Sequence, residues 1–563
     1  MITKVGQIRT ANPNATLLVN TGDTIQGSAE ALFSAGQTLV SVLNGFAIDA
    51  YAPGNWDFTY GTRRFAQFFT PLDLPNPPGT PAVVKATNAW GATAANLYYT
   101  DELPEFASLA GQRVLPPYLI KEIAGIKIGI IGLTSGDDEM NKQPVTDGLL
   151  FTTDGSELPE IIATLRDTEL VDLVVMVSEF GLAKNIVLAE RYPGIDVVLS
   201  SDMHEETTKP VVVKTGTIIS EAGQDGTQLA EMKVNVVDGK LGSWTYTLHT
   251  ITSAIPEATT LATSIQAIRS NFVTGSNFPC KQLPPGNPNG CTNPINGTKL
   301  TVPIDTPVGT ATTNLYRANF SQETLPGAIE GTSSNLLSEA FREQAGADVG
   351  NIRGFRYGTH VAAASSIRVE DLFHFLGVGA QIAKINVPGW MLKYQMEFIL
   401  DRVIYPDPLV WGGGWFGAYA GVRAWVDPAG IPGFRLLIVQ VFNRTKQKWE
   451  LLNPLKDYSY AGYFFDIRPD VVGGLPVPDG ETATVLKGPA GEKLDATQVV
   501  TNYLATHSAD PGSKRITLLA PLPKPLFGNP EIQPLRGVCP RITSGCKLFT
   551  FPPLLDLSDF MNL

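Results

Sequence analysis

Histidine and charged residues are scarce in this chain. Its 563 residues include five histidines, and charged residues make up 17% of the composition. The formal net charge is −12, which argues against nucleic acid or an anionic membrane as the main partner. Any metal site in this chain must therefore be poor in histidine.

Long hydrophobic runs are also absent. No apolar stretch reaches the roughly 18 residues that a membrane-spanning helix needs, so we expect no membrane span. The first residues, MITKVGQIRTANPNATLLV, lack the basic and then apolar pattern of a secretory signal peptide. We therefore expect any export signal to lie outside this sequence.

The four cysteines fall into two close pairs, Cys280 with Cys291 and Cys539 with Cys546. Neither spacing matches a familiar zinc pattern. We predict that each pair closes a small loop as a disulfide, which indicates an oxidising, periplasmic or extracellular location. The alternative is that the four thiols are unrelated.

The first part of the chain alternates short apolar strands with helical patterns. The runs ATLLVNTGD, IKIGIIGLTS, VDLVVMVSE and IDVVLSSD are apolar and end in polar residues, as buried strands do. Segments with helical spacing, such as SAEALFSAGQTLVSVLNGF and GLAKNIVLAERY, lie between them. The pattern predicts a layered α/β domain over residues 1–254, with ligands beyond the carboxyl ends of the strands.

The rest of the chain changes character. We expect residues 255–310 to form a connecting helix and the loop closed by Cys280 and Cys291. A second, α+β domain is predicted over residues 311–525, with helices in SSNLLSEAFREQAG and WMLKYQMEFILDRVI and strands in FRLLIVQVFN and YSYAGYFF. Residues 526–563 form a Pro-rich tail.

Polar side chains stand where the predicted strands of the first domain end. They are Asp23, Asn55, Glu179, Asp202 and His204, and Asp57 lies in the same loop as Asn55. Carboxylate, amide and imidazole groups at one edge of a sheet suit divalent cations, and two such ions can clamp a phosphoryl-like group and activate water. For each residue alone, capping a turn or a helix is the alternative role.

The segments around these residues carry a family resemblance. GDTIQGS, GNWDFTYG, the Ser178–Glu179 pair, SSDMHEETTKPVVV and ISEAGQDGTQLAEMKV follow in the order of the motif blocks of the metallophosphatase/5′-nucleotidase superfamily. SSNLLSEAFREQAGADVGNIRGFRYGT resembles its C-terminal domain, and GFRYGT with the later YPDP is especially similar to Sox-type thiosulfohydrolases. The resemblance covers about residues 1–525. It implies a layered α/β/β/α sandwich followed by an α+β domain.

The resemblance also assigns roles to the strand-end residues. Asp23 matches the carboxylate that bridges two metal ions, and Asn55 matches an asparagine ligand. Glu179 stands where the family has a histidine, and Asp202 and His204 stand where it has a Gly-His-x-His pair. Two divalent ions are therefore implied, and an oxygen-rich set favours manganese-like ions over zinc.

Two departures from the family pattern bear on catalysis. Trp56 and Thr59 occupy the places of the catalytic His–Asp dyad of nucleotidases, and an indole cannot relay a proton. The catalytic group would then be a metal-bound water, as in the thiosulfohydrolase branch. The family's opening Asp-x-His strand is missing before Met1, so we expect a preceding segment that this sequence does not include.

The loop GNIRGFRYGT suggests how an anionic substrate is held. Arg353 and Arg356 can hold a phosphate, sulfate or thiosulfonate group, and surface ion pairing is their alternative role. Phe355 and Tyr357 line a substrate slot or pack internally.

These expectations define a function. We expect a metal-dependent hydrolase of a phosphate- or sulfate-like ester, most like a thiosulfohydrolase of sulfur oxidation that releases sulfate from a carrier-bound thiosulfonate. Its partners would be a small anionic substrate or the carrier protein, and not nucleic acid. Two alternatives stay open: a 5′-nucleotidase or other phosphoesterase, and a non-catalytic protein on a degenerate hydrolase fold.

Overall fold

The chain folds into two compact units in the computed structural model. One comprises Met1–Gln26 with Glu30–Cys291, and the other comprises Gly27–Ala29 with Thr292–Leu563. The structure describes residues 1–76, 82–281, 290–316, 329–352, 360–404, 409 and 416–522. The boundary after Cys291 falls within the segment that the sequence predicted as a connection. In the described residues, no helix is long and apolar enough to span a membrane.

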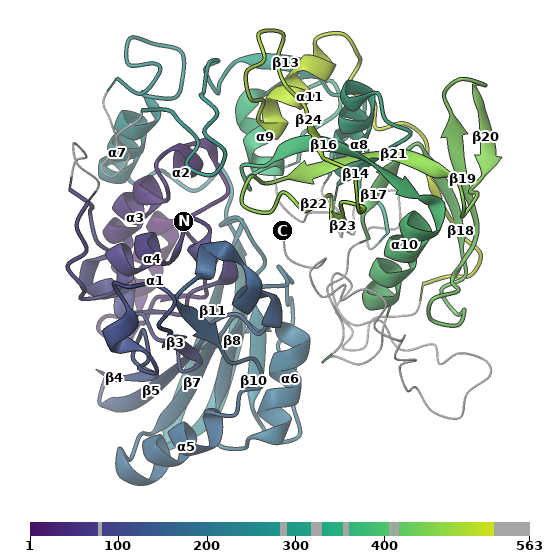
Figure 1. Ribbon diagram of the computed structural model, residues 1–563. Coiled ribbons are helices and arrows are strands. Elements are labelled where there is room, and N and C mark those ends of the chain that lie inside the picture. Colours follow the sequence, from purple (N-terminus) through teal and green to yellow (C-terminus); the bar gives the residue numbers. More distant parts are fainter. Residues whose placement is uncertain are drawn as a thin grey trace. The chain divides into compact units, whose positions relative to one another are not determined.

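A six-stranded sheet forms the centre of the first unit (Figure 1). In spatial order its strands are β4 (Tyr118–Ile123), β5 (Ile126–Leu133), β7 (Leu173–Ser178), β8 (Val197–Ser200), β10 (Ile218–Glu221) and β9 (Val211–Val212). The four strands β5, β7, β8 and β10 run parallel to one another, and the edge strands β4 and β9 are antiparallel to them. Their continuous apolar sequences follow from this arrangement, because parallel strands are covered on both faces.

The carboxyl ends of these parallel strands are level with one another. Leu133 pairs with Ser178, Ser178 with Ser200, and Ser200 with Glu221. A separate parallel pair, β1 (Val19–Asn20) and β2 (Ala50–Tyr51), lies at the same edge, because the Ser201 hydroxyl donates a hydrogen bond to the Thr21 carbonyl. The segments that follow β1, β2, β7 and β8 therefore meet in one place.

Helices cover the strands of the first unit. They are α1 (Ile2–Ala11), α2 (Ala29–Phe33), α3 (Gln37–Leu43), α4 (Thr62–Phe69), α5 (Leu158–Ala163), α6 (Leu182–Arg191) and α7 (Thr259–Arg269). Helix α6 packs on β8 and β10 (Figure 1). The helical pattern predicted over SAEALFSAGQTLVSVLNGF is interrupted at Gly36, whose φ of 81° is left-handed and ends the helical turn.

Two antiparallel strand pairs complete this unit. Strands β11 (Gln228–Val237) and β12 (Lys240–Thr250) form a β-hairpin, and β3 (Leu97–Tyr99) pairs with β6 (Leu149–Phe151). A cluster of buried aromatic rings lies beneath the β1–β2 edge, formed by Tyr51, Phe58, Phe65, Phe69, Trp90 and Phe151. These rings give the loops after β1 and β2 a rigid base.

The second unit contains two larger sheets. The first has the order β17 (Ala418–Ala420), β14 (Val349–Ile352), β21 (Asp457–Phe464), β16 (Gln381–Pro388) and β24 (Thr484–Val485). The second has the order β20 (Lys448–Leu451), β19 (Leu436–Asn443), β18 (Val422–Val426) and β25 (Ile516–Leu518). Shorter pairs join β13 (Pro307–Thr310) to β15 (Ser366–Arg368) and β22 (Val471–Val472) to β23 (Leu475–Pro476).

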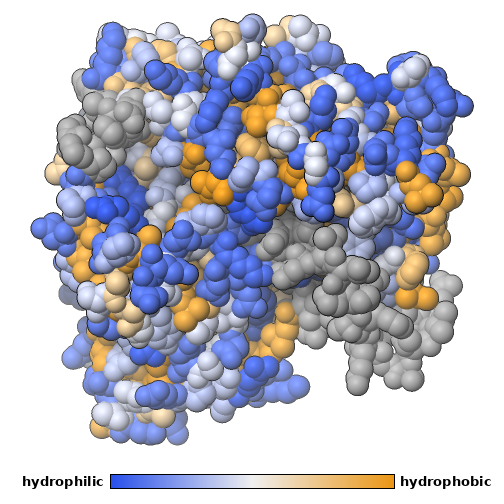
Figure 2. All heavy atoms as spheres, in the orientation of Figure 1, coloured by the Kyte–Doolittle hydropathy of each residue, from blue (hydrophilic) through white to orange (hydrophobic). Residues whose placement is uncertain are grey.

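Four helices pack on these sheets: α8 (Thr332–Ala345), α9 (Val369–Phe375), α10 (Gly389–Ile404) and α11 (Ala496–Leu504). Helix α8 contacts β14 and β17, and α10 contacts β16 and β19. The apolar core between them includes Leu392, Met396, Leu400 and Tyr460. Some apolar side chains stay at the surface over β19 and β20, among them Leu437 and Leu451 (Figure 2).

One of the two predicted disulfides is confirmed. Cys280 and Cys291 are bonded to each other across a sequence separation of 11 residues. Cys539 and Cys546 lie outside the described residues, so their pairing stays a prediction.

We expect the double variant Cys280→Ser with Cys291→Ser to lower the free energy of unfolding by about 3 kcal/mol, because the open loop regains chain entropy in the unfolded state. Urea unfolding of the full chain, followed by tryptophan fluorescence, measures this loss. The wild-type protein under reducing conditions is the control and should show a similar loss. Free thiols at both positions in the oxidised wild-type protein would contradict the pairing.

Candidate active site

The loops that follow β1 and β2 touch through their backbones. Gly22 has a φ of 109°, and a Cβ atom at this position would lie 2.6 Å from the backbone nitrogen of Gly54. A side chain at Gly54 would in turn overlap Asp23. Only glycine permits this approach, which places the Asp23 carboxylate directly beside the 54–56 turn.

The 54–56 turn links two of the predicted ligands. The backbone N–H of Trp56 donates to Asp23 Oδ1 at 2.9 Å, and the backbone N–H of Asn55 donates to Glu179 Oε2 at 3.1 Å. Asn55 begins the 3₁₀ helix Asn55–Phe58, and Glu179 follows β7 directly. The structure therefore brings Asp23, Asn55 and Glu179 together.

The loop after β8 contributes at the same edge. Asp202 Oδ2 lies 3.4 Å from the position of a Cβ atom built on Gly181, two residues after Glu179. The Asp202 charge also acts on the Glu179 carboxyl. His204 is oriented differently, because its Nδ1 lies 3.1 Å from Gln224 Oε1.

Three of the five predicted residues have a left-handed backbone. The φ angles of Asp23, Asp202 and His204 are 52°, 85° and 57°. Each such conformation costs of the order of 1 kcal/mol or more for a residue with a side chain. Left-handed residues also occur elsewhere in the described chain, Ala35 and Ala124 among them. The conformation therefore sets the direction of these three side chains but does not by itself mark a site.

The site concentrates negative charge away from water. Glu179 is 1% exposed. Burial raises its pKa well above the ordinary value, and repulsion from Asp23, Asp202 and Asp57 raises it further. A bound cation would offset both effects, because it would neutralise the carboxylates where water does not reach them.

Two buried oxygen atoms mark the centre of this site. Asn55 Oδ1 and Glu179 Oε1 have no hydrogen-bond partner within the described parts of the chain. Leaving a buried acceptor without a partner costs about 1–3 kcal/mol. Carboxylate and amide oxygens are also the donors that hard divalent cations prefer, so the chemistry of these residues fits such an ion.

The coordination geometry itself is not formed by these side-chain positions. Across the described ranges, no group of three or more His, Cys, Asp or Glu residues is arranged to hold a metal ion. One oxygen each of Asp23 and Glu179 accepts a backbone N–H, and His204 approaches Gln224. The two-metal site thus stays a proposal.

Asp57 supports the site. The sequence placed it in the same loop as Asn55 but assigned it no role as a ligand. Its Oδ1 accepts N–H groups from Thr24 at 2.7 Å and Ile25 at 3.1 Å. Its Oδ2 accepts from the Tyr51 hydroxyl at 2.5 Å and the Gly54 N–H at 2.8 Å. Burial raises the pKa of Asp57, and these four bonds oppose that rise. The one sequence signal is its place two residues after Asn55.

A second buried network fixes the loop that carries Asp202 and His204. Glu221 is 2% exposed, and it accepts hydrogen bonds from the Ser200 hydroxyl at 2.7 Å and the Glu205 N–H at 2.8 Å. Asn185 donates to the same hydroxyl at 3.0 Å. The ISEAGQDG motif contains Glu221, but its sequence alone does not reveal this role.

The predicted substrate-binding residues lie outside the described part of the chain. They are Arg353, Phe355, Arg356 and Tyr357, and they come directly after β14 in the sequence. Their roles remain those that the sequence resemblance implies.

Comparisons with known proteins bear on the family. Residues 307–468 match the model of the 5′-nucleotidase C-terminal domain. A trifunctional nucleotide phosphoesterase of Bacillus subtilis is 22% identical over 253 residues, which cover 41% of this chain and 17% of that protein. The human 5′-nucleotidase is 26% identical over 199 residues, which cover 35% of this chain and 31% of that protein. The matched part thus spans less than a third of these relatives.

Solved structures establish the fold. The sulfate thiohydrolase SoxB of Thermus thermophilus has a TM-score of 0.71 at 19% identity, covering 94% of this chain and 84% of that one. A 5′-nucleotidase precursor from the same species has a TM-score of 0.67 at 16% identity, covering 92% of this chain and 93% of that one. The predicted resemblance and fold class are confirmed. The chain has the α/β fold of the metallophosphatase/5′-nucleotidase superfamily and carries its C-terminal domain.

We expect Asp57→Ala to destabilise the first unit by about 3 kcal/mol or more, because four buried donors lose their acceptor together. The matched control is Asp57→Asn, which keeps one oxygen for Thr24 and Ile25 and should lose less. Thermal or urea unfolding of the full-length variants gives both values. Equal stability of Asp57→Ala and the wild type would refute the support role.

Proposed function

We propose that this protein is a metal-dependent hydrolase of a phosphate- or sulfate-type ester. One observation carries the proposal: two buried oxygens without partners in the described chain, on Asn55 and Glu179, lie among carboxylates that repel one another. A divalent cation satisfies the oxygens and the charges at once. Fold relatives that are described as a thiohydrolase and a 5′-nucleotidase support the same class.

The residues would divide the work between binding and support. Asp23, Asn55, Glu179, Asp202 and His204 would hold divalent ions, which when bound supply a Lewis acid and an activated water. Asp57 keeps Asp23 and Asn55 in position through the 24–25 and 54 backbone. Glu221 does the same for the loop with Asp202.

A thiosulfonate on a carrier is the substrate that the residues near the site favour. Trp56 occupies the position of the nucleotidase catalytic histidine, and its side chain has no group that can take up a proton at neutral pH. Arg353 and Arg356 would bind the anionic head of the substrate. The disulfide between Cys280 and Cys291 supports a periplasmic or extracellular location.

A phosphomonoester is the second candidate substrate. The observation in its favour is the match of residues 307–468 to the 5′-nucleotidase C-terminal domain. In such an enzyme a group other than residue 56 would have to assist the leaving oxygen.

Metal binding is the first test of this proposal. We expect the purified full chain, equilibrated with Mn²⁺ and then desalted, to retain close to two ions, and Asp23→Ala to lose most of them because a shared ligand is gone. Asp238→Asn removes an exposed carboxylate in the β11–β12 turn and should bind like the wild type. Elemental analysis by mass spectrometry counts the ions. Full occupancy in Asp23→Ala would remove the basis of the proposal.

Substrate turnover is the second test. With Mn²⁺ present, we expect sulfate release from a thiosulfonate-bearing carrier peptide, and a loss of more than about 100-fold in Asp23→Ala, since even residues behind the metal ligands account for 10–100-fold. AMP and p-nitrophenyl phosphate are assayed in parallel by phosphate release. Faster turnover of these esters would assign the phosphoesterase function instead. Metal binding without any turnover would indicate the non-catalytic alternative.

A further inference from the structure

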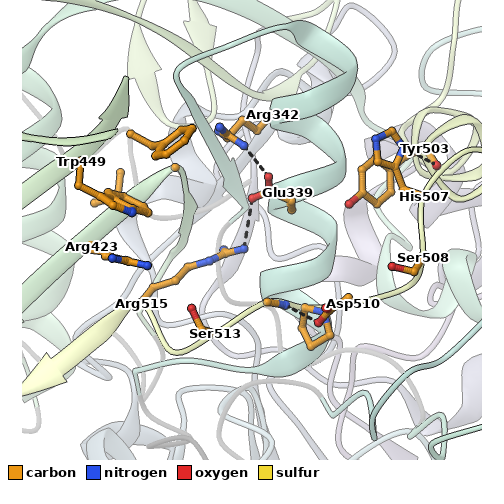
Figure 3. A pocket seen from close by; sticks show the side chains of 15 residues that line it. Glu339, Arg342, Arg423, Trp449, Tyr503, His507, Ser508, Asp510, Ser513 and Arg515 are labelled. Atoms are coloured by element: carbon orange, nitrogen blue, oxygen red, sulfur yellow. Dashed lines mark hydrogen bonds and ion pairs between the residues drawn. The ribbon is translucent and has the colours of Figure 1, made fainter. Parts of the chain in front are cut away.

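A pocket of about 440 Å³ lies within the second unit, outside the proposed metal site (Figure 3). It is lined by α8, by β18, β19 and β20, and by the segment that follows α11. Arg342, Arg423 and Arg515 contribute positive charge to its lining, and Tyr503 and His507 contribute rings. None of its lining residues belongs to the proposed metal or substrate site.

Two of the three arginines already bind other residues in the wall of the pocket. Arg342 Nη1 lies 2.5 Å from Glu339 and 2.6 Å from Glu343. Arg515 donates to the Ser338 hydroxyl at 2.8 Å and to the Asn335 carbonyl at 2.8 Å. Arg515 Nη2 also lies 3.6 Å from Glu339. The donors and the charges of both arginines are therefore matched inside the protein.

Arg423 differs from both. Its guanidinium carbon lies 4.1 Å from the ring centroid of Trp449, which is itself held edge-to-face by Phe442 at 5.3 Å. Arg423 makes no ion pair with any residue that the structure describes. Stacking on a ring fixes the plane of a guanidinium and leaves its N–H groups available, which is the arrangement that binds oxyanions.

The charges and donors around Arg423 point to an anion. Three arginines and two acids, Glu339 and Asp510, line the pocket. Glu339 and Glu343 pair with Arg342, and Glu339 also pairs with Arg515, so Arg423 is the lining arginine whose charge has no paired acid in the described chain. The hydroxyl groups of Ser508 and Ser513 line the same space. Within the described chain neither hydroxyl has a hydrogen-bond partner, so both can donate to a ligand.

We propose that this pocket binds a tetrahedral oxyanion, phosphate or sulfate, either free or as the end group of a small ester. Arg423 provides the charge and the paired donors, and Trp449 holds Arg423 in place. The inference is independent of the proposed catalytic function, because every residue that carries it lies between 339 and 515 and outside the metal site.

The test uses the full chain with the Asp23→Ala substitution in EDTA, so that metal-dependent anion binding in the first unit is removed. Phosphate, sulfate and phenyl phosphate are titrated at constant ionic strength against chloride, by calorimetry and tryptophan fluorescence. We expect saturable binding that weakens by about tenfold or more on adding Arg423→Gln, because a charged, bidentate contact is lost. Phenyl phosphate binding more tightly than phosphate would identify an ester as the ligand.

Two further variants decide what a loss of binding means. Lys446→Gln removes the same charge from an exposed position and should leave the affinity within about twofold, since exposed charges act weakly. Arg423→Lys keeps the charge but not the planar fork and should also weaken binding. Unfolding midpoints verify that each variant is folded. The proposal is overturned by an absence of saturable binding in the Asp23→Ala protein, or by equal affinity in the Arg423→Gln protein.

Discussion

A single buried carboxylate organises the proposed metal site. Asp57 accepts hydrogen bonds from the chain after β1, from the chain after β2 and from the Tyr51 ring in the core. Ionised carboxylates are costly to bury unless donors surround them, and here four donors do. Together with the close approach of Gly22 to Gly54, this one group makes the two loops a rigid platform for Asp23 and Asn55.

The level strand ends extend that platform to the rest of the site. Because β5, β7, β8 and β10 end side by side, Glu179 and Asp202 emerge next to the 54–56 turn without a long loop. Glu221 and Ser200 then anchor the loop behind Asp202. The cost of this arrangement is visible in the raised pKa of Glu179 and in the partnerless oxygens of Asn55 and Glu179 within the described chain.

The sequence predicted the parts of this site that depend on strand periodicity. Asp23, Glu179 and Asp202 each follow an apolar run, and parallel strands bring such positions to one edge. It could not reveal that Asp57 rather than a metal ligand holds the turn, because that role depends on N–H groups about thirty residues away in the chain. The orientation of His204 was hidden for the same reason, since Gln224 reaches it only in the folded unit.

The second unit illustrates a related limit. Arg353 and Arg356 belong to a recognisable motif, whereas nothing near Arg423 in the sequence marks it as special. Its distinction arises from β18 and β20, which bring it over Trp449. Whether an arginine is free to bind a ligand depends on which acids lie near it in the folded chain. The order of residues in the sequence does not show this.

The left-handed residues at the sheet edge carry a consequence for the protein's robustness. At Asp23, Asp202 and His204 the native backbone angles suit glycine or asparagine better than the residues present. Replacing these residues by glycine or asparagine would then raise thermal stability and remove the proposed metal ligands. This is the usual trade-off between stability and activity. Selection for thermal endurance alone would thus drive these three positions away from function.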